Sequence, residues 1–411
     1  MALLMTLVSH LTVGAAAVRA DQPAHRFDAS GVVALLDVMD AVAAAHPDFP
    51  AKEAELGRLP EGEREAAFDR AREVNEASGE VRAAIRALLA TPTYQIYFRR
   101  FTNVTAEEVS DLLLDLPYRQ RRAPGQIGVT LYELVRKRGL VRSALDRLLA
   151  EADADRVYET ARAFAPVWKG ELPTLHLIYD SNAGSFVAEG VPFFNVFTGI
   201  DLETLSASAD DSLVPEAEET MAHELQHVLA EPTLYPEPEV ERSWQQDWID
   251  QLTRGLVGEG VANLCSPPSG GIKAVYEDPE VLAALVERYD HLMRALLAGR
   301  ITEDEVRAWY RENYFEVATG LLRSHLAKRH SGEELEAAVR SAMRYRPDVE
   351  HALGWWMVSR IWQRDPSPAV VAGLLEDPFS VYRLYNETLG DGDDDLRFAP
   401  DLVRQLTGAD P

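Results

Sequence analysis

Two histidines four residues apart constrain the fold of this chain more than any other feature of its sequence. His223 and His227 enclose Glu224 in the segment HELQH. Residues i and i+4 lie one above the other on the same face of an α-helix, so the two imidazoles can bind one tetrahedral Zn²⁺ if this segment is helical. Glu224 lies about 100° further round such a helix. There its carboxylate can hold a metal-bound water and take its proton.

The residues around HELQH predict where this helix begins and ends. Pro215 is followed by three glutamates within four residues, and the helix macrodipole favours acids in a first turn. Pro232 predicts the end of the helix. Between the two prolines, apolar residues recur at spacings of three and four: Met221, Leu225, Val228 and Leu229. We therefore expect the helix to bury this stripe and to present its histidines to a cleft. The alternative is an ordinary helix with two satisfied or exposed histidines.

A third ligand decides between these alternatives, because catalytic zinc usually has three protein ligands and a water. The longer metzincin signature is excluded, since Ala230 and Thr233 occupy its glycine and histidine positions. The remaining common solution is a glutamate from a second helix. The segment 248–265 (WIDQLTRGLVGEGVANLC) supplies Glu259, which follows His227 by 32 residues.

Glu259 has unusual neighbours for a helical glutamate. Gly258 and Gly260 flank it and leave space for another helix to approach closely. Asn263 follows four residues later, on the same helical face, where its side chain could accept a hydrogen bond from the free ring nitrogen of a ligating histidine. The alternative for Glu259 is a solvated glutamate on a helix surface. Competing ligands lie in a Pro-rich loop: Glu237, Glu239 and Glu241.

HELQH followed by GEGVAN resembles the gluzincin metallopeptidases, whose third ligand is a glutamate on a downstream helix. The chain also resembles, more specifically, a poorly characterised family of bacterial and archaeal zinc-dependent peptidases, over most of its length after about residue 28. That closer resemblance rests on the same two motifs, on SNAGSFVAEGVPFFNVFTGID and on GWWM. It implies one Zn²⁺ per chain, bound by His223, His227 and Glu259, with Glu224 as general base and a peptide or protein as substrate.

The sequence departs from the gluzincin pattern at two places. Residues 231–247 lengthen the connection between the two motifs, which implies an inserted loop near the cleft. Asn263 stands where thermolysin-like enzymes usually carry aspartate, so the group beside the paired histidine is neutral here.

One region, Pro173 to Asp201, is clearly strand-like. Apolar residues alternate from Leu175 to Tyr179, and Asn182 begins a turn with Ala183 and Gly184. We expect a small antiparallel sheet beside the metal helix, with 183–186 as an edge that pairs with an extended peptide substrate and Ala183 and Gly184 as substrate-binding residues. The alternative is a hairpin that only closes one side of a helical core.

The predicted fold class is α+β and mostly helical, with a zincin-like core and helical lobes on both sides. Residues 1–26 are a candidate signal peptide or a disordered start, 27–168 an N-terminal helical lobe, 169–270 the catalytic core and 271–411 a C-terminal helical lobe. The hydrophobic fraction of 46% is ample for this core.

The net charge limits which partners the chain can bind, and its cysteine content limits disulfide formation. The net charge of −26 argues against nucleic acid and against binding to anionic membranes. The single cysteine, Cys265, excludes an internal disulfide and is expected to be buried. No Lys or Arg precedes the apolar run 3–18, which favours a cytoplasmic location over secretion and leaves the compartment open. The oligomeric state is not indicated.

Other residues offer weaker indications. Gluzincin-like enzymes often need a late Tyr or His to bind the oxyanion, and the candidates for contact with the cleft are His351, Gly354, Trp355 and Trp356. The alternative is an aromatic stripe in a core helix. Two further possible donors have no assigned role: Tyr345 and Tyr385. The acidic segment 391–395 lacks the alternation of a calcium loop and is interpreted as a solvated turn.

Three functions are compatible with these patterns. The first is zinc-dependent hydrolysis of peptide bonds, with Glu224 moving the proton. The second keeps the zinc but acts on a non-peptide amide or ester. The third is a metal-free helical interaction protein.

Overall fold

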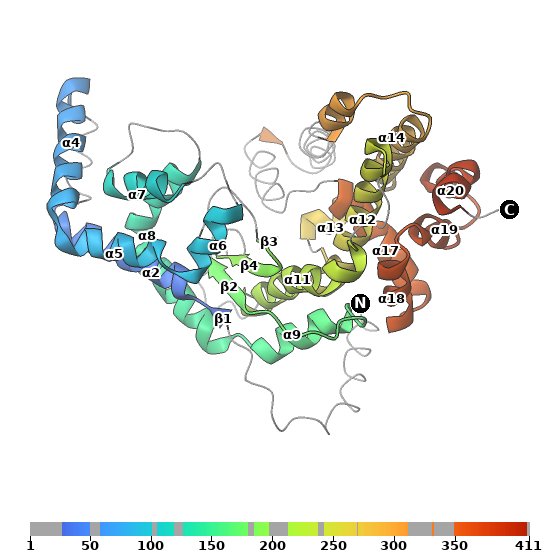
Figure 1. Cartoon of the computed structure of the whole chain (residues 1–411), viewed down its shortest axis with the longest axis horizontal. Coiled ribbons are helices and arrows are strands. Elements are labelled where there is room, and N and C mark those ends of the chain that lie inside the picture. The colour runs from blue at the N-terminus through green and yellow to red at the C-terminus, as the bar shows by residue number, and fades with distance from the viewer. Residues whose placement is uncertain are drawn as a thin grey trace, which may run out of the picture.

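A computed structural model describes most of the chain as helices around one small sheet. The described residues are 27–49, 58–100, 105–118, 126–179, 185–196, 213–236, 242–268, 270–310, 331–332 and 349–408. Figure 1 shows the N-terminal helices and the C-terminal helices at opposite ends, with the sheet and α11 between them. The predicted α+β class, mostly helical, is confirmed.

Among the described residues, seven helices lie between the first strand, β1 (Phe27–Asp28), and the second, β2 (Leu175–Ile178). They are α2 (Ser30–Ala45), α4 (Glu61–Ala77), α5 (Gly79–Leu89), α6 (Pro92–Arg100), α7 (Ala106–Leu114), α8 (Gln126–Glu151) and α9 (Ala154–Ala163). Helix α7 begins with a capping box, in which the Thr105 side chain accepts from the Glu108 N–H and the Glu108 carboxylate accepts from the Thr105 N–H.

The later helices include those that carry the predicted ligands. They are α11 (Leu213–Leu234), α12 (Trp244–Cys265), α13 (Gly270–Tyr276), α14 (Pro279–Leu297), α17 (Val349–Arg364), α18 (Pro368–Glu376), α19 (Ser380–Asn386) and α20 (Pro400–Thr407), with the short 3-10 helix η2 at Asp394–Leu396. Helix α11 continues just past Pro232, where the sequence predicted its end. Its last carbonyl, on Leu234, accepts a hydrogen bond from the buried Arg254 of α12.

The sheet has four strands in the order β1-β2-β4-β3. They are β1 (Phe27–Asp28), β2 (Leu175–Ile178), β3 (Phe186–Ala188) and β4 (Val191–Asn195). Strands β1 and β4 both pair with β2 in parallel, and only β3 and β4 are antiparallel. The predicted antiparallel sheet is therefore wrong: the sheet is mixed. Alternation of apolar residues identifies a segment as a strand. It does not show which strand pairs with it, or whether the pairing is parallel, because both depend on distant segments such as β1.

Strands β3 and β4 form a tight hairpin at the edge of the described sheet. Glu189 and Gly190 both have positive φ, 51° and 69°, which is the conformation of a two-residue type I′ turn. Glycine suits the second position because it has no Cβ. The hairpin leaves β3 as an edge strand, with no further strand paired to it among the described residues.

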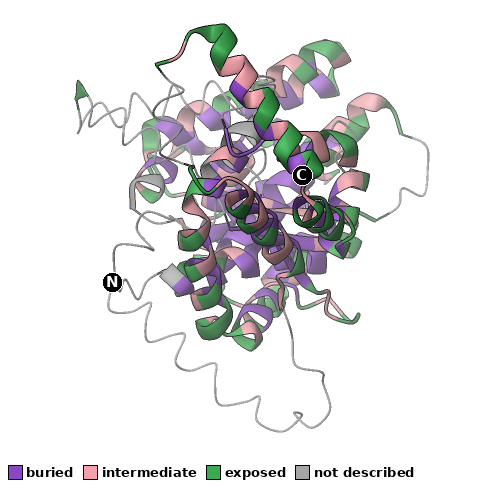
Figure 2. Cartoon of the chain, turned by 90° about the vertical axis from the view of Figure 1, so that its left-hand side faces the viewer, coloured by how far each residue is buried: buried purple, intermediate pink, exposed green. Residues whose placement is uncertain are grey.

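Two hydrophobic cores meet on α11. The first combines the N-terminal helices and the sheet with Met221 and Leu225. The second combines the C-terminal helices and α12 with Ala230 and Leu234, further along the same helix. Figure 2 shows the buried residues gathered inside and the exposed ones on the outer faces of the helices. The stripe predicted for this helix is buried: Met221, Leu225 and Leu229 belong to the first core, and Val228 is 4% exposed.

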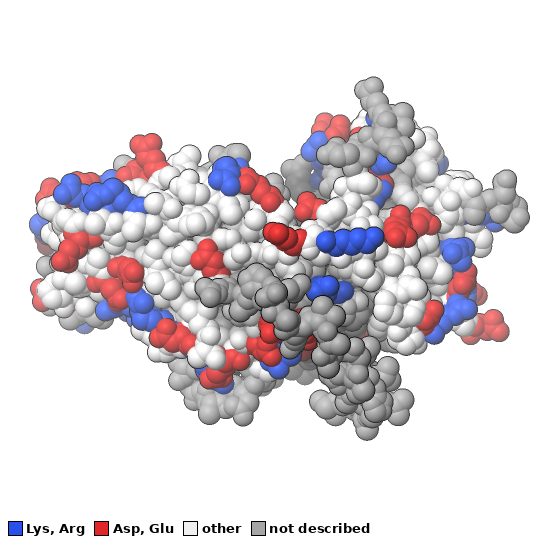
Figure 3. All heavy atoms as spheres, turned by 60° about the horizontal axis from the view of Figure 1, so that its bottom comes forward, with Lys and Arg blue, Asp and Glu red and all other residues white. Residues whose placement is uncertain are grey.

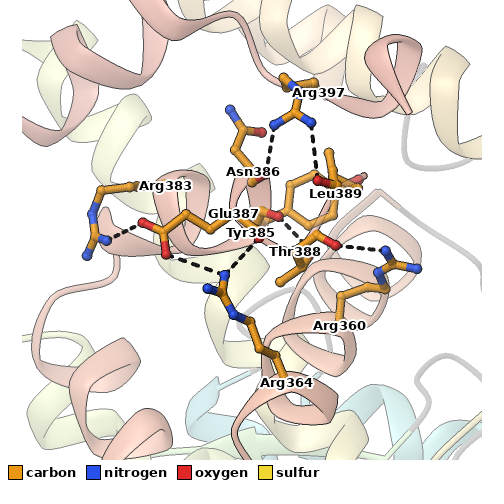
Figure 4. Close-up of polar contacts among 9 residues, drawn as sticks. All are labelled: Arg360, Arg364, Arg383, Tyr385, Asn386, Glu387, Thr388, Leu389 and Arg397. Carbon is orange, nitrogen blue, oxygen red and sulfur yellow. Dashed lines mark hydrogen bonds and ion pairs between the residues drawn. The ribbon is translucent and has the colours of Figure 1, made fainter. Parts of the chain in front are cut away.

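Helix α17 is held in the second core by arginines (Figure 4). Arg360 donates to the Thr388 carbonyl at 3.0 Å and Arg364 to the Glu387 carbonyl at 2.7 Å, both just after α19. Arg397 donates to the Asn386 carbonyl at 2.7 Å. Cationic side chains suit the carbonyl end of a helix, where the macrodipole is negative. The bonds from Arg360 and Arg364 join α17 to the end of α19, and the bond from Arg397 joins the segment after η2 to the same end.

The surface carries both signs of charge. On the face shown in Figure 3, acidic side chains lie among Lys and Arg and do not form one continuous patch. Within the described ranges, every helix is too short or too polar to cross a bilayer.

Candidate metal centre

The structure brings together the three predicted metal ligands. His223 and His227 of α11 place their Nε2 atoms 3.1 Å apart. Glu259 of α12 places Oε2 3.4 Å from His223 Nε2 and Oε1 3.5 Å from His227 Nε2. Among the described residues, these three form a group whose ligand atoms all lie within 4.8 Å of one another. Glu259 therefore faces both imidazoles and not the solvent.

The spacing of these atoms fits a tetrahedral ion. Bonds of about 2.0–2.2 Å to zinc place tetrahedral ligand atoms roughly 3.3–3.6 Å apart. The two imidazoles lie 3.1 Å apart, and each lies 3.4 or 3.5 Å from a different oxygen of the Glu259 carboxylate, so all three side chains can reach one ion. In addition, Glu259 Oε2 is buried and has no hydrogen-bond partner. A buried carboxylate oxygen normally has a partner, because its desolvation is costly. A divalent cation between the three side chains would supply one.

The glycines beside Glu259 explain how its helix reaches two other helices. A Cβ on Gly258 would lie 3.1 Å from the Leu234 side chain of α11. A Cβ on Gly260 would lie 2.5 Å from the Gly354 carbonyl of α17, closer than real Cβ contacts come. The two glycines thus face different helices, and each allows close packing on its own side. Glu259 lies between the two glycines and is therefore placed where α11, α12 and α17 meet.

Glu224 is also buried at this junction. Its residue is 8% exposed, and burial raises the pKa of its carboxyl to about 7, against an attraction from His227 that lowers it. A general base works best with a pKa near the working pH. The position beside the ligands and the raised pKa are the properties expected for the base.

Two of the three proposed ligands, His223 and Glu259, have the protonation states that metal binding needs. Burial lowers the pKa of His223 to about 4, so its imidazole is neutral near pH 7 and has a lone pair for a metal. Burial alone would raise the pKa of Glu259, but the imidazoles of His351 and His227 hold it well below its ordinary value. These two side chains therefore present an ionised carboxylate and a neutral imidazole. Burial would lower the pKa of His227, but the carboxylates of Glu259 and Glu224 raise it overall, so a metal competes with a proton for that imidazole.

A comparison with protein families agrees with this geometry. A family model described as "Putative zinc dependent peptidase (DUF5700)" matches residues 85–389, which is most of the chain. The chain belongs to this family. No curated protein and no solved structure matches it.

The DUF5700 match covers the site and most of the fold. It begins within α5 and ends just after α19, so it contains β2, β3, β4 and the helices that carry the ligands. Strand β1 and helices α2, α4 and α20 lie outside it. The family description supports a zinc-dependent peptidase. The group of His223, His227 and Glu259 is where a metal ion could be held in this chain.

The other residues predicted from the sequence have different outcomes in this DUF5700 chain. Asn263 is 6% exposed and its amide nitrogen has no acceptor. No hydrogen bond joins it to either ligating histidine among the described side chains, so its role remains a prediction. Ala183 and Gly184 lie outside the described residues, although the edge strand β3 begins two residues later. Cys265 is buried as predicted, and burial raises the pKa of its thiol.

Of the late candidates, His351 alone is near the ligands. Its Nε2 lies 3.0 Å from Glu259 Oε2, and its ring is parallel to that of His223, with 6.0 Å between centroids. Gly354 instead packs against the α12 backbone, and Trp356 donates to the Tyr385 hydroxyl at 3.0 Å. The predicted donor Tyr345 lies outside the described residues, and the segment 391–395 is a turn followed by η2.

Tyr235 was not predicted from the sequence, yet it lies beside the site. Its residue is 48% exposed. Its hydroxyl lies 3.7 Å from the position that a Cβ on Gly258 would take, next to Glu259. The signal in the sequence is spacing, because Tyr235 follows His227 by eight residues and comes directly after the last residue of α11. Such an aromatic ring near an open site is available for contact with a bound molecule.

Proposed function

We propose that this chain is a mononuclear zinc peptidase of the gluzincin type, with one Zn²⁺ held by His223, His227 and Glu259. One observation carries the proposal: a glutamate from α12 meets both histidines of α11 at distances suited to one tetrahedral ion. The membership in DUF5700 supports the same metal and the same class of reaction.

Zinc and Glu224 would have different roles in the hydrolysis. Zinc, when bound, supplies a Lewis acid that polarises the scissile carbonyl and makes a water more acidic. Glu224 accepts the proton of the attacking water and delivers it to the leaving amine nitrogen. Because burial raises its pKa to about 7, the carboxylate can accept this proton and release it near neutral pH. The buried surroundings of Glu224 also strengthen its interactions with the developing charges.

The edge strand β3 supports a peptide as substrate. In a two-residue hairpin the closing pair is hydrogen-bonded, and here that pair is Ala188 and Val191. Hydrogen-bonded and non-bonded pairs alternate along an antiparallel ladder, so the N–H and C=O of Val187 point away from β4. Pro192, which has no N–H, stands opposite Val187. An extended peptide can pair with this free backbone.

The position of the hairpin links this edge to the metal centre. Strands β3 and β4 both pack against α11, which carries His223 and His227. A mixed sheet with an antiparallel edge strand on the metal helix supports a zincin-like core for residues 169–270. A small ester or amide would make no use of such an edge.

Metal analysis and a substrate comparison test the proposal. The full chain, purified without a histidine tag, should contain about one zinc per chain, lose activity with a chelator and recover it with Zn²⁺. A peptide library should be cleaved, and matched small esters should not. Absence of zinc would instead favour a metal-free interaction protein. Cleavage of esters or non-peptide amides alone would keep the zinc and replace the substrate class.

A further inference from the structure

His351 contacts Glu259 more closely than either predicted ligand histidine does. Its Nε2 lies 3.0 Å from Glu259 Oε2, whereas the corresponding distances are 3.4 Å for His223 and 3.5 Å for His227. A separation of 3.0 Å is within the donor–acceptor range of an N–H···O bond, although this pair does not have the angle of one. The side chain of His351 is 28% exposed.

The geometry separates His351 from the ligands themselves. It is not a member of the group whose ligand atoms lie within 4.8 Å of one another. Its ring is parallel to the His223 ring, at 7° between planes and 6.0 Å between centroids, so it stacks beside that ring. His223 and His227, in contrast, direct their Nε2 atoms toward each other. His351 therefore contacts Glu259 through Nε2 and stacks beside His223, but it does not belong to the ligand group itself.

The packing of α12 against α17 fixes this contact. A Cβ on Gly354 would lie 2.3 Å from the Leu256 carbonyl, and one on Gly260 would lie 2.5 Å from the Gly354 carbonyl. The two helices thus touch at their backbones. His351 lies one helical turn before Gly354, and Glu259 directly precedes Gly260. The same glycine pair that joins the helices therefore brings the imidazole to the carboxylate.

Glu259 is the proposed ligand whose orientation depends most on contacts with other residues. The two histidines lie on one helix, where the i, i+4 spacing alone aligns them. Glu259 comes from another helix and has a flexible side chain, and fixing such a side chain costs rotamer entropy. A contact that restricts the carboxylate before the metal arrives removes part of that cost from metal binding.

We propose that His351 is a positioning residue, which holds the Glu259 carboxylate for the metal through its Nε2. This role rests on the proposed metal centre. Groups that orient a metal ligand typically contribute about 10- to 100-fold to metal affinity, and that is the size of effect expected here.

Zinc affinity of His351 variants tests the role. In competition with a chromophoric chelator, H351A should bind zinc about 10- to 100-fold more weakly, and the Co²⁺-substituted protein should show a changed visible absorption spectrum. H351Q, whose amide nitrogen reaches a similar position, should recover most of the affinity. The matched control is H291A, because His291 is an exposed histidine on α14 and its loss should change neither measurement.

A double-mutant cycle shows whether His351 acts through Glu259. If it does, H351A in an E259A background should weaken zinc no further, so the two losses do not add. Losses that simply add would overturn the proposal, as would wild-type zinc affinity in H351A. If H351A keeps its affinity but loses turnover, His351 acts on the substrate and not on Glu259.

The same measurements distinguish this role from the proposed function. Zinc binding is measured without any substrate, so a chain that does not cleave peptides can still show the loss in H351A. If the wild-type chain binds no zinc, the metal centre itself is wrong and the role of His351 is overturned with it. Urea unfolding of the metal-free variants should match wild type, which separates positioning from a loss of folding.

Discussion

Replacing Glu224 with glutamine separates its chemistry from its structural role. The two side chains have nearly the same shape, and the three proposed ligands are unchanged, so E224Q should still bind zinc. The amide cannot accept the proton of the attacking water. General bases contribute about 10²- to 10⁴-fold, so kcat should fall by that factor, which corresponds to about 3–5 kcal/mol in activation free energy.

The same change should stabilise the metal-free protein at high pH. Burial raises the pKa of Glu224 from 4.5 to about 7, and each unit corresponds to about 1.4 kcal/mol. Between these two values the folded state keeps a proton that the unfolded state has lost, so the free energy of unfolding decreases as pH rises. Above pH 7 the buried carboxylate therefore costs the wild type about 3 kcal/mol. Glutamine carries no such cost.

Urea denaturation of metal-free wild type and E224Q measures this difference. The two proteins should be about equally stable near pH 4.5, and E224Q should be more stable by about 3 kcal/mol near pH 8. The matched control is E216Q, because Glu216 is exposed on the first turn of the same helix and its loss should leave turnover unchanged. Turnover that survives in zinc-loaded E224Q refutes the base. A stability difference that does not grow with pH refutes the effect of burial.

Three further changes test other parts of the structure. G354A would place a Cβ 2.3 Å from the Leu256 carbonyl, so urea unfolding should show a loss of about 1–3 kcal/mol; unchanged stability would contradict the backbone contact. V187P removes an outward N–H from β3, so kcat/KM for peptides should fall about 2- to 10-fold, with small esters and thermal stability unaffected; an equal loss on esters would argue against pairing with this edge. Burial lowers the pKa of His176 below 6.5, so stability should fall below that pH as the unfolded state alone takes up a proton. H176Q should lose less between about pH 7 and about pH 5 in urea denaturation, and an identical loss would exclude His176 as the source.

Local patterns in the sequence predicted which side chains meet at the candidate metal centre. The i, i+4 spacing of His223 and His227 is a property of one helix, so it can be read without knowing the rest of the fold. Glu259 could be recognised because its flanking glycines are unusual inside a helix, and the structure gives both of them a partner helix.

Contacts between distant segments could not be predicted in the same way. Strand β1 pairs with β2 across more than a hundred residues, and nothing in the alternation of β2 indicates a parallel neighbour. His351 was one of several late candidates, since its contact with Glu259 depends on how α17 packs against α12. The same packing turns Trp356 toward Tyr385 and away from the site. These outcomes depend on tertiary packing, which local spacing does not determine.

The division of the two cores explains why the ligands come from different helices. Helix α11 contributes Met221 and Leu225 to the first core and Ala230 and Leu234 to the second, and its two histidines lie near the change from one to the other. Glu259 belongs to α12, which packs in the second core. A metal bound by all three side chains would therefore join the two cores as well as build the site. Small changes in how these cores pack would alter the distance from Glu259 to the imidazoles, so the glycines of α12 and the contact from α17 control the metal centre through its geometry.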